Sequence, residues 1–122
     1  MQILIIKPGQ KPEVQEIDGT LESMQGIVGG LIQAIYPYEQ PVALVANDEG
    51  KALGLPLNRG LRDEDRVLYD IICGTFFIVG APVDSGNFPS LTDVQILYFM
   101  ELFSKPEMFL MMNGCLLVLP CE

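Results

Sequence analysis

Histidine is absent from the 122 residues, and so is tryptophan. Without histidine the chain has none of the Ser-His or Cys-His pairs on which nucleophilic catalysis commonly depends, and it lacks the most frequent zinc and copper ligand. The carboxylate run Asp63-Glu64-Asp65 has no EF-hand spacing around it. An enzyme would need carboxylates or tyrosines as its acid and base. We therefore predict a non-enzymatic protein with no catalytic residues, metal or cofactor.

Positive charge is also scarce. Seven Lys and Arg residues stand against sixteen Asp and Glu residues, which gives a formal net charge of −9. This balance argues against general nucleic-acid binding, because backbone phosphates need a basic surface. Two interpretations of the acidity remain: it keeps the protein in solution, or it forms a face that meets a basic partner. The first is favoured, since the sign of the charge alone rarely identifies a partner.

Cysteines are few, and long apolar runs are missing. Cys73, Cys115 and Cys121 are odd in number and none forms a C-x-x-C pair, so a reducing cytosol is more plausible than a disulfide framework. The N-terminus lacks the basic segment of a signal peptide, and no run of about 20 apolar residues exists to span a membrane. We expect a cytoplasmic protein without a membrane association.

The apolar residues that are present, 49% of the chain, predict a single domain over residues 1–122. Short apolar runs separated by turn residues predict strands over residues 2–7, 14–17, 31–36, 41–46 and 69–79. The Asn113-Gly114 pair between two apolar runs predicts a C-terminal hairpin. We predict an α+β fold: a single, mostly antiparallel sheet with two short helices packed on it and this hairpin.

Two helices complete the prediction. The first begins after Asp18 or Thr20 and ends at Gly29-Gly30, because Thr and Asp cap helices and glycine ends them. The second begins with Ser90 as its N-cap and ends near Ser104. Its predicted apolar face consists of Val94, Leu97, Tyr98 and Leu102, interrupted by Glu101.

The three arginines of this acidic chain lie within eight positions, at Arg59, Arg62 and Arg66, in a segment that we interpret as a turn. Guanidinium groups bind phosphates and carboxylates through two parallel hydrogen bonds. Asn58, Arg59 and Arg62 are therefore candidate ligands of an anionic, nucleotide-type molecule. The structural alternative, which is the more common situation, is that the arginines pair with nearby acids and hold the turn. The acids in question are Asp63, Glu64, Asp65 and Asp70.

Aromatic residues near this segment are candidates for stacking on a ligand ring: Tyr36, Tyr69 and Phe76. Phe76 and Phe77 alternate along a strand, so one of them could point away from the main core. The alternative, that such residues fill the core, is favoured. Methionines and phenylalanines accumulate after residue 98 and suggest a homo-oligomer interface, with a packed hairpin as an equal alternative.

Three segments resemble the domain of unknown function family numbered 3846: IDGTLESMQGIVGG at 17–30, AIYPYEQPVALVANDEGKALGLPLNR at 34–59 and DIICGTFFIVG at 70–80. The resemblance covers residues 1–105, and residues 106–122 form an apolar extension beyond it. It implies a small domain found in phages, conjugative elements and their bacterial hosts, mostly Firmicutes. The family has no assigned catalytic residues.

Together these observations predict a small binding protein from a phage or mobile element. The first hypothesis is a counter-defence protein that sequesters an anionic nucleotide-type signal with Asn58, Arg59, Arg62 and one of the three aromatics. The alternative is an acidic interaction module that inhibits a host protein.

Overall fold

The computed structural model describes residues 1–82 and 88–121, and its central element is a five-stranded antiparallel sheet. The strand order is β2-β1-β7-β4-β3, with β1 at Gln2–Ile6, β2 at Glu13–Glu16, β3 at Ile32–Ile35, β4 at Val42–Asn47 and β7 at Phe76–Gly80. The three inner strands read QILII, FFIVG and VALVAN. Such near-continuous apolar runs arise when both faces of a sheet are covered.

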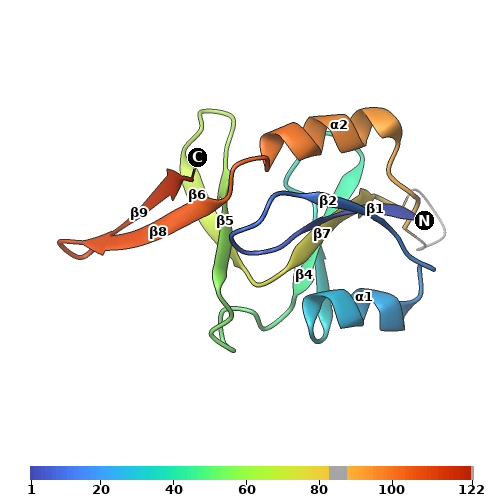
Figure 1. Cartoon of the computed structure of the whole chain (residues 1–122), viewed down its shortest axis with the longest axis horizontal. Coiled ribbons are helices and arrows are strands. Elements are labelled where there is room, and N and C mark those ends of the chain that lie inside the picture. The colour runs from blue at the N-terminus through green and yellow to red at the C-terminus, as the bar shows by residue number, and fades with distance from the viewer. Residues whose placement is uncertain (83–87, 122) are drawn as a thin grey trace.

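Each face of the sheet is covered by one helix, α1 (Leu21–Val28) or α2 (Asp93–Leu102), and Figure 1 shows the two helices on opposite sides. Because side chains alternate along a strand, neighbouring residues enter different cores. Phe76 packs with Ile96, Phe99 and Phe103 on the α2 side, whereas Phe77 packs with Met24 on the α1 side. Both phenylalanines are completely buried, so Phe76 is a core residue.

The α+β fold with a mainly antiparallel sheet, two helices and a C-terminal hairpin is confirmed. The prediction of one central strand over residues 69–79 is wrong. Gly74 adopts a φ of 82°, and its N–H donates to the Pro56 carbonyl at 2.7 Å. The chain therefore changes sheets at this glycine: β6 (Leu68–Cys73) pairs with β5 (Leu57–Arg62) in a separate two-stranded sheet, and β7 enters the main sheet. A Cβ at this glycine would lie 2.8 Å from the Leu55 side chain, so glycine fits the crossing best.

Helix α1 begins and ends as predicted. Thr20 is its N-cap and accepts a hydrogen bond from the Ser23 N–H, while Gly29 ends it in the left-handed conformation. Asp18 supports the cap, because its Oδ1 accepts from the Thr20 N–H at 2.9 Å and from the Ser23 hydroxyl at 2.6 Å. These hydrogen bonds, that from Ser23 first, lower the pKa of Asp18 to about 2.

This depressed pKa predicts a local pH dependence of stability. A carboxylate whose pKa is lower in the folded state stabilises the fold above its unfolded pKa, and the contribution disappears as the pH falls through the folded pKa. The Asp18→Asn variant should therefore unfold more easily than the parent above about pH 4, and the difference should vanish near pH 2. Urea unfolding of both proteins between pH 2 and pH 6 measures it; a difference that does not change with pH would contradict the assignment.

Helix α2 differs from the prediction at its start and on its buried face. Thr92, not Ser90, is the N-cap, and it forms a capping box with Gln95. The Ser90 hydroxyl instead accepts a hydrogen bond from the N–H of Gln2, the first residue of β1, at 2.7 Å. The buried helix residues are Ile96 and Phe99, whereas the predicted apolar face is exposed to solvent. The helix ends at Leu102, close to the predicted end.

The last element is the predicted hairpin, β8 (Glu107–Met112) paired with β9 (Cys115–Pro120). Asn113 and Gly114 form its turn with φ values of 52° and 78°, as two-residue hairpins of this type require. Figure 1 shows it projecting from the body at the end of the molecule opposite the N-terminus. In the described ranges, no helix is long and apolar enough to cross a membrane.

Candidate functional site

The candidate arginines lie on a strand rather than in a turn. Residues 57–62 form β5, so the prediction of an arginine turn is wrong for Arg59 and Arg62. The turn follows, and Arg66 lies in it with a φ of 64°. Asp63 holds this turn, because its Oδ1 accepts hydrogen bonds from the N–H groups of Asp65 and Val67, both at 2.9 Å.

Asn58 is completely buried and links three parts of the chain. Its Nδ2 donates to the Ile6 carbonyl on β1 at 2.9 Å and to the Gly74 carbonyl at 2.8 Å. Its Oδ1 accepts from Arg59 Nη1 at 2.8 Å. All of these partners belong to the protein, so Asn58 positions Arg59 and β5 and does not face a cavity.

Arg59 is 1% exposed, and carbonyl oxygens surround its guanidinium. Nη2 donates to the carbonyls of Gln10 at 2.6 Å and Phe103 at 3.1 Å, while Nη1 donates to the backbone and side chain of Asn58. Nε has no hydrogen-bond partner. Burial lowers the pKa of Arg59, and the charge of Glu107 opposes that shift. The expected pairing with nearby acids is not what holds it: among the described residues, no carboxylate forms a salt bridge with Arg59.

Arg62 and the backbone of Gly60 bind one carboxylate together. Glu107 Oε2 accepts from Arg62 Nη2 at 2.7 Å, and Glu107 Oε1 accepts from the Gly60 N–H at 2.8 Å. The Glu107 side chain is 8% exposed, whereas that of Arg62 is 37% exposed. A guanidinium and a backbone N–H that converge on two oxygens form an anion-binding arrangement, and here the first residue of the C-terminal hairpin supplies the anion.

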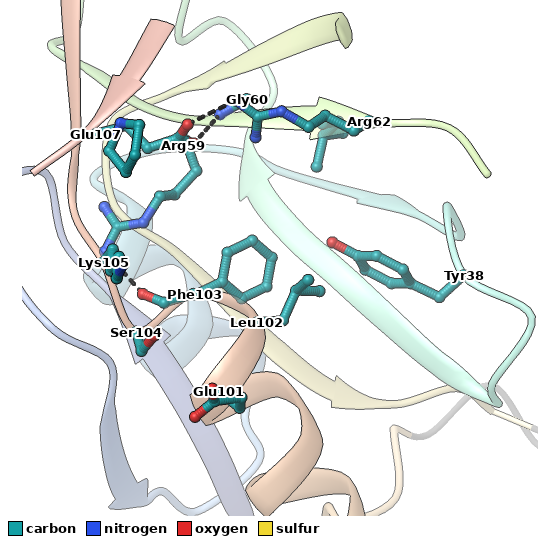
Figure 2. Close-up of a pocket in the computed structure, with 12 residues that line it drawn as sticks. Tyr38, Arg59, Gly60, Arg62, Glu101, Leu102, Phe103, Ser104, Lys105 and Glu107 are labelled. Atoms are coloured by element: carbon teal, nitrogen blue, oxygen red, sulfur yellow. Dashed lines mark hydrogen bonds and ion pairs between the residues drawn. The ribbon is translucent and has the colours of Figure 1, made fainter. Parts of the chain in front are cut away.

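A cleft of about 500 Å³ lies beside these groups, between β5, the end of α2 and the start of β8 (Figure 2). Its wall contains three of the seven cationic residues of the chain, Arg59, Arg62 and Lys105, against two acids, Glu101 and Glu107. The rest of the lining is Tyr38, Gly60, Leu61, Leu102, Phe103, Ser104 and Pro120. The cleft is therefore locally cationic in a protein of net charge −9.

Tyr38 lines this cleft together with Phe103, and the sequence did not single Tyr38 out as a site residue. Its ring packs 4.9 Å from that of Phe99, and in Figure 2 its hydroxyl points towards the other lining residues. Burial, followed by the nearby Tyr69 and Tyr98, raises the pKa of Tyr38, so its hydroxyl remains a hydrogen-bond donor. The one signal in the sequence was the pair of tyrosines around Pro37.

The three aromatics that were predicted do not line the cleft. Tyr36, which precedes Pro37 in the sequence, is 57% exposed to solvent. Tyr69, 55% exposed on β6, lines a different hollow with Lys51 and Asp70, which form a salt bridge. Phe76 is buried with its ring edge against Phe103, at a centroid distance of 5.4 Å.

Comparison with known families identifies the domain. The family model described as Domain of unknown function (DUF3846) matches residues 1–104. The chain belongs to this family. No curated protein and no solved structure gives a significant match. The DUF3846 match contains Asn58, Arg59 and Arg62, whereas Lys105 and Glu107 follow it. The cleft is thus built by the family domain on one side and by the C-terminal extension on the other.

Proposed function

We propose that this DUF3846 domain is a non-enzymatic, cytoplasmic binding protein that holds a small anionic molecule of the nucleotide type in the cleft beside Arg59 and Arg62. The observation that carries the proposal is Arg59: a buried cation at the wall of an open cleft, with carbonyl oxygens but no carboxylate in its salt-bridge range among the described residues. Burial of a charge is costly unless an opposite charge compensates for it. An anion in the cleft would provide that compensation.

The contacts of Glu107 support the same chemistry. Its carboxylate already receives hydrogen bonds from the Gly60 N–H and from Arg62, which are donors that a phosphate oxygen could also use. Lys105 and Tyr38 add a further cation and a hydroxyl to the lining. The volume of about 500 Å³ lies in the range typical of small-molecule sites. Sequestration of a nucleotide signal, as expected of a mobile-element protein, would require binding of this kind without turnover.

Thermal and chemical unfolding in the presence of nucleotides, cyclic nucleotides and inorganic phosphate tests the proposal. A ligand present at 100 times its dissociation constant should add about 2.7 kcal/mol to the free energy of unfolding. Inorganic phosphate separates recognition of the phosphate alone from recognition of the whole nucleotide. The Arg62→Gln variant should lose most of this stabilisation. A complete absence of ligand effects, or an equal effect in Arg62→Gln, would refute the proposal.

Two further variants make the test specific. Arg66→Asn removes the same charge outside the cleft, at a left-handed position that asparagine tolerates, and should bind like the parent. Glu107→Gln keeps an acceptor for the Gly60 N–H but removes the negative charge beside Arg62, so it should bind anions more tightly. Opposite effects of Arg62→Gln and Glu107→Gln would localise the ligand to this cleft.

A second candidate function is the inhibition of a host protein, and the outer surface of α2 favours it. Val94 and Leu97 are 77% and 70% exposed there, and the acidic residues Asp93 and Glu101 are exposed on the same helix. Such a surface would suit a partner with both apolar and basic groups. Pull-down from host lysate at increasing salt tests it: a partner held by the acidic residues should be released as ionic strength rises.

A further inference from the structure

The two faces of the C-terminal hairpin differ. Directly opposed residues of an antiparallel pair point to the same face, and so do residues two positions apart. The register therefore places Met108, Leu110, Met112, Cys115, Leu117 and Leu119 on one face, which we call the outer hairpin face. All six residues are exposed. On the other face, Glu107, Phe109 and Val118 are partly buried, whereas Met111, Leu116 and Pro120 are exposed.

The outer hairpin face has no polar side chain and no cover from the described part of the chain. Its centre is the cross-strand pair Leu110 and Leu117, which are 40% and 39% exposed, and Met112 near the tip is 55% exposed. A two-stranded ribbon is only marginally stable by itself, and an apolar surface of this kind usually marks an interaction site. The outer hairpin face is therefore a candidate interaction surface.

We propose that the outer hairpin face binds the same face of a second copy of this chain and forms a two-fold symmetric dimer. The distribution of charge indicates this face for a contact between two copies. The protein carries a net charge of −9, so two copies repel each other over most of their surfaces. From Met108 to Cys121 there is no charged residue, and the hairpin projects away from the acidic body (Figure 1). It is a surface through which two such molecules can meet without opposing like charges.

The size of the face agrees with a dimer. At the observed exposed fractions it offers roughly 500 Å² per copy, so two copies would bury roughly 1,000 Å², the lower limit for a specific interface. An apolar ribbon is also complementary to itself, as a two-fold interface requires. A membrane surface is less suited to it, because interfacial segments normally carry Lys and Arg beside their apolar residues, and the hairpin has none.

Sedimentation-equilibrium centrifugation over a range of protein concentrations tests the dimer. The parent should approach twice its mass of 13.5 kDa as the concentration rises. Because the interface is uncharged and the bodies repel, association should strengthen when the salt concentration increases. Leu117→Glu and Leu110→Glu place a charge at the centre of the face and should each be monomeric at every concentration, with the circular dichroism of a folded protein.

The matched control is Leu97→Glu, which introduces the same charge at an exposed leucine of α2 and should leave the dimer intact. Four results would overturn the proposal: a parent that stays monomeric, dimers that persist in both hairpin variants, dimers that dissociate in Leu97→Glu, or dimers that weaken with added salt. A parent that is monomeric but sediments with neutral phosphatidylcholine vesicles would assign the face to a lipid surface instead.

Discussion

The Asn58→Ala variant is expected to lose about 3 to 5 kcal/mol of stability, enough to unfold much of the population if the domain is marginally stable. The substitution removes both donors to the Ile6 and Gly74 carbonyls and the side-chain acceptor of Arg59. Each buried polar group left without a partner costs about 1 to 3 kcal/mol. The loss also affects three parts of the chain at once, because these hydrogen bonds connect β5 to β1 and to Gly74, between β6 and β7.

Urea unfolding followed by circular dichroism measures the effect, and Gln33→Ala is the matched control. Gln33 carries the same amide on an exposed strand position, so its truncation should change the free energy by no more than about 0.5 kcal/mol. If Asn58→Ala proves as stable as Gln33→Ala, the hydrogen bonds of Asn58 do not hold the sheets together. In that case Asn58 would again be a candidate ligand-binding residue.

The partners of Asn58 and Arg59 explain why the sequence could not place these residues. The two side chains bind the carbonyls of residues 6, 10, 74 and 103, which are between 16 and 52 positions away. Backbone carbonyls leave no mark in a sequence, since every residue has one. The nearby acids were visible and suggested local ion pairs, yet the acid that binds Arg62 is Glu107, 45 positions away. Of the three clustered arginines, Arg59 and Arg62 line the cleft and Arg66 does not, and the local acids are not the partners of Arg59 or Arg62.

Features controlled by local chemistry were predicted well. The Asn113-Gly114 hairpin and the Thr20 and Gly29 caps of α1 depend on backbone conformations that particular residue types favour. At Gly74 the residue type alone does not decide the structure, because whether a glycine bends a strand or ends it depends on which strands pair around it. Tyr38 and Tyr36 likewise have the same local sequence signal, and only the packing of Phe99 decides which of them lines the cleft.

In helix α2, the pattern of apolar residues is compatible with two different buried faces. Its sequence is apolar almost all round, so residues 94, 97, 98 and 102 form one helical stripe and residues 96, 99 and 103 form another. The spacing of apolar residues alone does not show which of the two stripes is buried. In the structure the second stripe is buried, because Phe99 packs on Tyr38 and Phe103 packs on Phe76 in the core between α2 and the sheet. Leu97 and its neighbours remain in solvent as a result.

Phe99→Ala and Leu97→Ala therefore form a paired prediction of opposite outcome on one helix. Phe99 is completely buried and packs against three aromatic rings, so its truncation should cost about 3 to 5 kcal/mol. Leu97 is 70% exposed, so its truncation should stay within about 0.5 kcal/mol. Urea unfolding under the same conditions measures the free energy of unfolding of both variants. The reverse order of stabilities would mean that α2 packs on the sheet through its other stripe, and the cleft beside the end of α2 would then have a different lining.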